Sequence, residues 1–299
     1  MTPSSTLHRS LELASTLPAL MVAADRVAAT VIQGVHGRRR VGQGDAFWQY
    51  RPYRDGDSAS QIDWRQSARS RHLFVRETEW EAAASVWLWR DASPSMQYAS
   101  LRNSDTKAVR AEVLTLALAS LLADAGERVT VLGSGVRPTS GRIAVRRIAE
   151  TLFDETRANN AKALPSLPPL LPLPAHGTVV LVSDWLDPLD KIEQMMRHYA
   201  SGGVRGHLVQ VLDPAEEDLP FDGHVKFEGL EAEGQHTIRR VEAVRAAYGA
   251  RLAAQKEGLQ RLTSATDWTV HLHRTDKPPQ TVLLSLYLAM ADLRRLNAA

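Results

Sequence analysis

A carboxylate and two hydroxyl groups stand within five residues of each other at the end of an apolar run. The run 85–89 is typical of a buried β-strand, and Asp91, Ser93 and Ser95 follow it. Mg²⁺ is a hard cation that prefers oxygen ligands and takes few of them from the protein, because it keeps several waters. The segment therefore predicts a divalent cation site, although the same residue types at a strand-to-helix turn also cap helices.

A second apolar run, 178–183, ends directly in Asp184. Parallel strands end at one edge of their sheet, and open α/β sheets bind ligands outside that edge. We therefore expect Asp184 to lie close to Asp91 and to contribute a second carboxylate to the same site.

Strand and helix patterns alternate along the chain from residue 85 onward. The expected strands are 85–90, 128–132, 178–183, 207–212 and 268–272. The expected helices are 105–124, 143–153, 189–199, 241–262 and 281–296. This alternation predicts an α/β fold with a doubly wound, mostly parallel sheet of the Rossmann type. Between the last two strands, residues 215–240 are expected to form a loop with a hairpin.

The first 80 residues follow a different pattern and form a helical and loop-rich extension. Residues 1–35 are expected to be helical, whereas residues 45–76 mix aromatic and charged side chains without a helical or strand period. The segment 73–78 is short and extended, as expected of an edge strand. We interpret residues 1–80 as a helix followed by an aromatic and charged clamp segment, and residues 81–299 as the α/β domain.

The composition excludes several classes of function. The chain of 299 residues has no cysteine, which excludes disulfides, thiolate metal sites and cysteine nucleophiles. Its formal net charge is only +2, and the basic run 38–40 is short, so we expect no nucleic-acid partner. The apolar stretch 11–35 is interrupted by charges well below the ~20 residues of a membrane span. We expect no transmembrane segment and a cytoplasmic protein.

Two groups of motifs resemble the bacterial family known as domain of unknown function 58. The first runs through the clamp segment into the Asp91 element, and the second follows the strand at 207–212, so the resemblance covers nearly everything after residue 35. The residues that carry it are Gly44, Phe47, Arg51, Tyr53, Gly56, Asp57, Ile62, Asp63, Trp64, Ala68, Arg69, Val75, Arg76, Glu77, Asp91, Ser93, Ser95 and Met96, and then Asp213, Pro214, Ala215, Glu216, Leu219, Pro220 and Phe221.

This resemblance implies a core similar to the von Willebrand factor A domain, with a metal-ion-dependent adhesion site for Mg²⁺ or another divalent cation. The implied ligands are oxygen donors at the two strand ends, namely Asp91, Ser93, Ser95 and Asp184. Such a site also takes a threonine from an intervening loop, for which Thr139 or Ser140 is the nearby candidate. Arg90 departs from the family pattern, and by pairing with the carboxylate of Asp91 it could leave the site unoccupied.

The resemblance also implies a partner, a MoxR-type AAA+ ATPase with which this chain would work as an adaptor. The chain has no G-x-x-x-x-G-K-[ST] phosphate loop, so the energy source must lie elsewhere. We therefore expect a non-enzymatic interaction protein that binds other proteins through its cation. The sequence does not indicate an oligomeric state.

Two other functions remain open at this point. One is a phosphatase with Asp91 as nucleophile, although the motif is D-x-S, not D-x-D, and lacks the second carboxylate expected of the general acid. The other is a passive scaffold in which the Asp91 segment is only a capped turn. His271 and His273 share one face of a strand, but no further ligand stands at a readable spacing.

Overall fold

The computed structural model of the protein describes residues 22, 24–32, 47–53, 62–69, 72–78, 84–101, 104–159, 165–230 and 234–298. The chain divides into two compact units. The larger unit combines Met1–Val35 with Ala84–Ala299, and the smaller unit is His36–Ala83. The smaller unit is therefore an insertion between two segments of the larger one.

The larger unit is built on a parallel sheet of five strands in the order β4-β3-β5-β6-β9. The strands are β3 (Ser85–Arg90), β4 (Arg128–Val131), β5 (Thr178–Ser183), β6 (Arg205–Leu212) and β9 (Thr269–Arg274). The chain order reverses between β3 and β5, and this is the point at which doubly wound sheets bind ligands. The predicted doubly wound α/β fold is confirmed.

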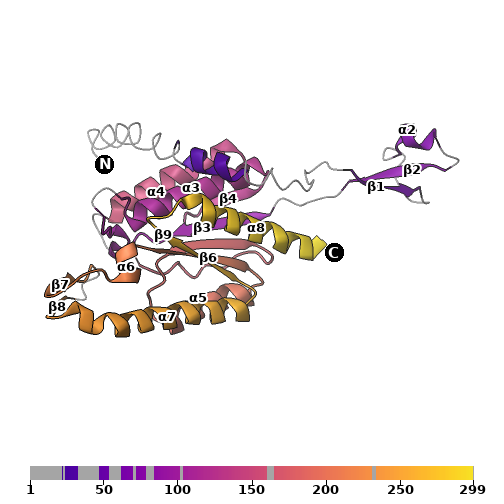
Figure 1. Ribbon diagram of the computed structural model, residues 1–299. Helices are drawn as coiled ribbons and strands as arrows, with labels where there is room; N and C mark the ends of the chain where they lie inside the picture. Colours follow the sequence, from indigo (N-terminus) through magenta and orange to yellow (C-terminus); the bar gives the residue numbers. More distant parts are fainter. Residues whose placement is uncertain are drawn as a thin grey trace, which may run out of the picture. The chain divides into compact units, whose positions relative to one another are not determined.

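Helices cover both faces of the sheet (Figure 1). The helices α3 (Lys107–Asp124), α4 (Arg142–Asn159) and α8 (Pro279–Ala298) lie on one face, and α5 (Leu189–Ser201) and α7 (Val241–Ala265) lie on the other. Side chains of a strand alternate between faces. Val86 and Leu88 of β3 accordingly pack into the first layer, whereas Trp87 and Trp89 pack into the second. Within the described residues, none of the helices is long and apolar enough to cross a bilayer.

The helical residues 24–32 belong to the larger unit. Val27 and Val31 are buried in the same apolar layer as α3, and Ser120 Oγ on α3 donates a hydrogen bond of 3.0 Å to Asp25 Oδ1. The contacts thus group this helix with the sheet, whereas the sequence analysis placed it with the clamp segment in residues 1–80.

The smaller unit contains a two-stranded antiparallel sheet of β1 (Phe47–Pro52) and β2 (Phe74–Thr78), with the short helix α2 (Trp64–Ser67) between them. The sequence indicated no element at 47–52. It identified the segment at 73–78 as an edge strand, and the structure pairs this segment with β1 in a separate sheet.

The connection from β6 to α7 contains a helix that the sequence analysis did not predict. The predicted hairpin is present as β7 (Val225–Glu228) paired with β8 (Gln235–Ile238), but α6 (Pro214–Asp218) precedes it where a loop was expected. Asp213 caps α6 by accepting the N–H of Ala215, and Glu216 accepts the N–H of Asp213. This reciprocal arrangement is the capping box, which fixes both residues.

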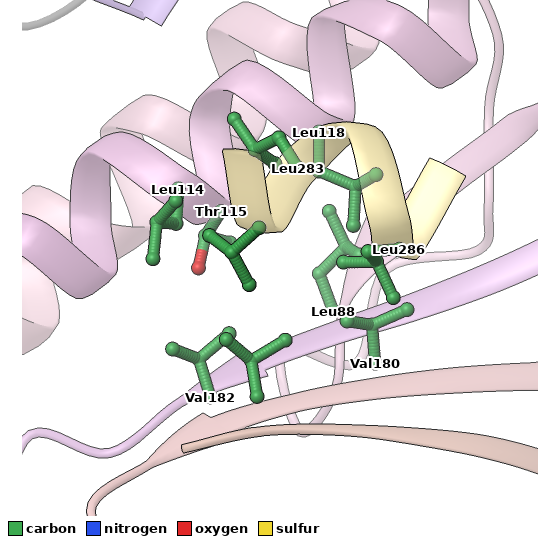
Figure 2. Close-up of a pocket in the computed structure, with 10 residues that line it drawn as sticks. Leu88, Leu114, Thr115, Leu118, Val180, Val182, Leu283 and Leu286 are labelled. Atoms are coloured by element: carbon green, nitrogen blue, oxygen red, sulfur yellow. The ribbon is translucent and has the colours of Figure 1, made fainter. Parts of the chain in front are cut away.

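A small cavity lies in the core between the sheet, α3 and α8 (Figure 2). Its volume is about 10 Å³, at the lower limit for one water. The side chains of Leu88, Val180, Leu118 and Leu286 form its walls. The hydroxyl of Thr115, which also lines it, already donates to the carbonyl of Ala111. The cavity is therefore a packing gap that offers no polar group to a ligand.

Gly206 is required by the close approach of a tryptophan. A Cβ atom at this position would lie 2.1 Å from the indole ring of Trp268, which is buried. We expect Gly206→Ala to lower the free energy of unfolding by roughly 2–3 kcal/mol, because the ring or strand must shift. Gly249→Ala on α7 is the matched control, since nothing lies within 4 Å of the added atom; alanine there should stabilise by about 0.5–1 kcal/mol. Urea unfolding of both variants measures the difference, and equal stabilities would contradict the predicted clash.

Candidate functional site

Asp91 lies at the carboxyl end of β3 and is fully buried. Its N–H donates to the carbonyl of Val182 at 2.7 Å, which extends the pairing with β5 by one residue. Its carboxylate accepts two hydrogen bonds, from the N–H of Ser93 to Oδ1 at 2.7 Å and from Ser183 Oγ to Oδ2 at 2.8 Å. Backbone and side chain are both fixed, so the carboxylate is held rigidly against the end of β5.

The hydroxyls of Ser93 and Ser95 lie 3.0 Å apart. Ser93 precedes the short 3₁₀ helix η2 (Pro94–Gln97) as its N-cap residue, but its side chain makes no capping hydrogen bond. Ser93 is buried, whereas Ser95 is partly exposed. Ser93 therefore does not act as a helix cap through its side chain, because its hydroxyl accepts no hydrogen bond from the backbone of η2. Ser95 is the residue of the site that solvent can reach.

Asp184 lies at the end of β5, as predicted, and is buried. Its Oδ2 accepts a hydrogen bond from Lys107 Nζ at 2.9 Å, and its Oδ1 lies 3.3 Å from the N–H of Leu186. The adjacent residue Ser183 donates to Asp91, so the two strand ends are in direct contact. The predicted convergence of the two acidic residues at one sheet edge is present in the structure.

Lys107 joins three elements of the fold at this edge. Its ammonium group lies 2.9 Å from Asp184 Oδ2 and 2.5 Å from Glu216 Oε1, and its side chain is 1% exposed. Burial alone would lower the pKa of Lys107, but the two carboxylates more than offset this and raise the pKa above its usual value. Lys107 is therefore a charged ammonium that links α3, the end of β5 and α6.

The backbone after Asp184 is held in an unusual conformation. Trp185 has a φ of +53°, in the left-handed region that a bulky residue rarely adopts. Its buried ring donates to the carbonyl of Val209 at 3.1 Å, and its own carbonyl accepts from Gln255 at 2.9 Å. Gln210 donates to the carbonyl of Asp184 at 2.8 Å. Side chains from β6 and α7 thus fix the direction of the backbone where the chain leaves β5 at Asp184.

The two carboxylates differ in how their charge is balanced. Burial raises the pKa of Asp91 to about 7, against the lowering effect of its hydrogen bonds from Ser93, and the nearby charge of Asp184 adds to the increase. Within the described part of the chain, no basic side chain forms an ion pair with Asp91, whereas Asp184 has Lys107. Among the residues that the structure describes, Asp91 is therefore a buried carboxylate without a counter-ion.

Arg90 does not pair with Asp91, because consecutive strand residues point to opposite faces. Its guanidinium group lies 3.1 Å from Glu112 Oε1 and donates to the carbonyl of Leu152 and to Thr156 Oγ1. These partners lie on α3 and α4. The expected competition between Arg90 and a cation for Asp91 is therefore wrong for this structure.

Thr139 lies on the outer side of the edge strand β4, where its backbone pairs with Val129 at 2.8 and 3.2 Å. Val129 pairs with Val86, which stands well before Asp91 on β3. At about 3.3 Å per residue, this offset is ~16 Å along the strands. The turn after β4 doubles back along the strand, so the structure does not bring Thr139, or Ser140 beside it, to Asp91.

The oxygen atoms at this edge are chemically suited to a hard divalent cation. Asp91, Ser93 and Ser95 contribute a carboxylate and two hydroxyls, which are hard oxygen donors. Among the described residues, no group of three or more His, Cys, Asp or Glu side chains could hold a metal ion. The donor set thus fits Mg²⁺, which takes few protein ligands, and does not fit zinc.

Three residues of the site escaped the sequence analysis. Ser183 was counted only as the last strand residue, and Lys107 as part of a helix start. Glu216 stands three residues after Asp213, which is the capping-box spacing, and this signal could have identified it. No local signal could have paired Lys107 with Asp184, because 77 residues separate them.

The comparisons with known proteins agree with this architecture at the level of family. The sequence pattern described as "Protein of unknown function DUF58" matches residues 49–258, more than half of the chain. The chain belongs to the DUF58 family. Uncharacterised proteins of Mycobacterium tuberculosis and Mycobacterium bovis are 25% identical to it over 247 residues, an alignment that covers 77% of this chain and 75% of each relative. No solved structure matches the chain.

The histidines that the sequence analysis considered as metal ligands lie on β9 of this DUF58 protein. His271 Nδ1 lies 2.7 Å from Ser285 Oγ, and its Nε2 lies 2.9 Å from Thr269 Oγ1. His273 is buried, and burial lowers its pKa to about 4, with Arg110 adding to the effect and Asp276 opposing it. Burial also lowers the pKa of His271 to about 4. Both rings are therefore neutral structural groups at pH 7.

Acidification should destabilise the protein through these histidines. An unfolded histidine takes up a proton near pH 6.5, whereas folded His273 resists it down to about pH 4, so stability falls as the pH drops through this window. The free energy of unfolding should be higher at pH 7 than at pH 5, and we expect His273→Gln to make this difference about 2 kcal/mol smaller. Urea unfolding at both pH values measures it, with exposed His236→Gln as the control. An unchanged pH dependence in His273→Gln would contradict the prediction.

Proposed function

We propose that this DUF58 protein is a non-enzymatic protein-interaction module whose binding face is centred on a divalent cation at Asp91, Ser93 and Ser95. One observation carries the proposal. Asp91 is a buried carboxylate without a counter-ion in the described residues, and the Ser93 and Ser95 hydroxyls follow it directly. Burying an uncompensated carboxylate is costly, and a bound cation would remove that cost.

The residues of the chain have separate tasks in this proposal. Asp91 supplies the negative charge, and the hydroxyls of buried Ser93 and partly exposed Ser95 supply neutral oxygen atoms. Ser183 holds the carboxylate in place through its hydrogen bond of 2.8 Å. When bound, Mg²⁺ offers open coordination positions to an acidic group of another protein. Asp184 contributes its charge from the neighbouring strand end.

We assign the partner by family resemblance as a MoxR-type AAA+ ATPase, for which this chain acts as adaptor. The sequence has no phosphate loop of its own, so the ATPase would supply the energy for remodelling a complex. The adaptor contributes a rigid binding face, because the side chains around Asp91 and Asp184 are held by hydrogen bonds on several sides.

The geometry gives less support to a phosphatase. A phosphatase with a nucleophilic aspartate also needs a second carboxylate as general acid, and Ser93 stands where a D-x-D motif would supply it. Asp184 could supply a second carboxylate, but its Oδ2 is engaged by Lys107. A screen of phosphoesters with Mg²⁺ that found turnover abolished by Asp91→Asn would reverse this order.

We expect Asp91→Asn to weaken Mg²⁺ binding by roughly tenfold or more, because it removes the charge of the carboxylate next to the two hydroxyls. Titration calorimetry with MgCl₂ on chelator-treated protein measures the change. The same variant should weaken Mg²⁺-dependent association with the ATPase.

Asp124→Asn is the matched control, since Asp124 is exposed at the opposite end of α3. Asparagine keeps the size of Asp91 and removes its buried charge, so the variant should be at least as stable as wild type without Mg²⁺, and any loss of binding is then attributable to the site. Identical Mg²⁺ affinities for wild type and Asp91→Asn, or ATPase binding that is indifferent to chelator, would refute the proposal.

A further inference from the structure

Lys107 lies at a helix position where a lysine is electrostatically unfavourable. It is the first residue of α3, after the N-cap Thr106, where the helix dipole is positive and repels a cation. The ammonium group is also removed from water, with a side chain only 1% exposed. Its position is therefore explained by its two acidic partners, Asp184 and Glu216, and not by the stability of the helix.

The ammonium group takes the place of an external cation at one of the two strand ends. It lies 2.9 Å from Asp184 Oδ2, whereas neighbouring Asp91 has no such partner within the described residues. A divalent ion between the strand ends would need the charge of Asp184, and it would be repelled by an ammonium group already bound to that carboxylate. Lys107 and the ion therefore compete for Asp184.

Glu216 gives Lys107 a second ion-pair partner. Its Oε1 lies 2.5 Å from Lys107 Nζ, while its Oε2 accepts the N–H of Asp213 at 2.8 Å and is thus fixed by the cap of α6. Lys107 can release Asp184 and still keep one ion pair. The exchange of Asp184 from the ammonium group to an ion then leaves Lys107 with one ion pair and not with none.

We propose that Lys107 is an intrinsic cation that limits the affinity of this site for divalent ions by holding Asp184. The inference rests on the proposed function, because it concerns the same cation. In this proposal Lys107 sets the affinity of the site for the ion. Asp184 becomes a ligand only when its ion pair with Lys107 is broken.

Removing the ammonium group should therefore improve ion binding. We expect Lys107→Met to lower the dissociation constant for Mg²⁺ roughly tenfold or more, since it frees Asp184 and removes a positive charge. The double variant Lys107→Met with Asp184→Asn should lose this gain. Titration calorimetry with MgCl₂ on chelator-treated full-length protein gives the constants, and the Mg²⁺-induced rise in melting temperature is a second readout.

Lys107→Met leaves buried Asp184 and partly exposed Glu216 without their ammonium partner and can unfold the protein. The variant Lys107→Met with Glu216→Gln keeps the prediction testable, because only Asp184 is then left free. Its matched control is Glu216→Gln alone, in which Lys107 still holds Asp184 and the affinity should be no higher than that of wild type.

The outcomes separate this inference from the proposed function. Equal Mg²⁺ affinities for wild type and the Lys107 variants would overturn the inference, while the effect of Asp91→Asn would still decide the proposed function. Binding by the Lys107 variants without binding by wild type would support the intrinsic cation and contradict an ion-loaded wild-type protein. A gain that persists in the double variant with Asp184→Asn would overturn the inference.

Discussion

The structure depends on the cost of burying two carboxylates side by side. Asp91 and Asp184 end adjacent parallel strands, both are almost completely removed from water, and the charge of Asp184 raises the energy of the charged form of Asp91. The fold balances one of them with Lys107 and the other only with hydrogen bonds. This imbalance makes the sheet edge a place where an added positive charge is favourable, which is the physical basis of the proposed interaction site.

The sheet topology brings these groups together, and distant side chains then fix them. The reversal of strand order makes β3 and β5 neighbours, so that residues 92 positions apart, Ser183 and Asp91, form a hydrogen bond. A left-handed backbone at Trp185 costs roughly 1–3 kcal/mol in general. It is maintained by contacts from β6 and α7, so the second layer of helices contributes to the geometry of the site although its residues do not line it.

The sequence predicted what depends on periodicity and strand ends. The apolar runs indicated β3 and β5, and the rule that parallel strands end at one edge indicated that Asp91 and Asp184 meet. It could not predict the direction or reach of single side chains. Arg90 turned to the opposite face, and Lys107 reaches a partner far along the chain. Thr139 was chosen by residue type and by its place in an intervening loop, but the turn after β4 places its backbone beside Val129 and far from Asp91.

The smaller unit, His36–Ala83, is inserted directly before β3, and this has a mechanical consequence. β3 begins at Ser85, lies between β4 and β5, and delivers Asp91 at its other end. A displacement of β3 along its own axis would shear its hydrogen bonds to β4 and β5 together. The same displacement would move Asp91 away from Ser183, so the charged end of the sheet would come apart in that movement.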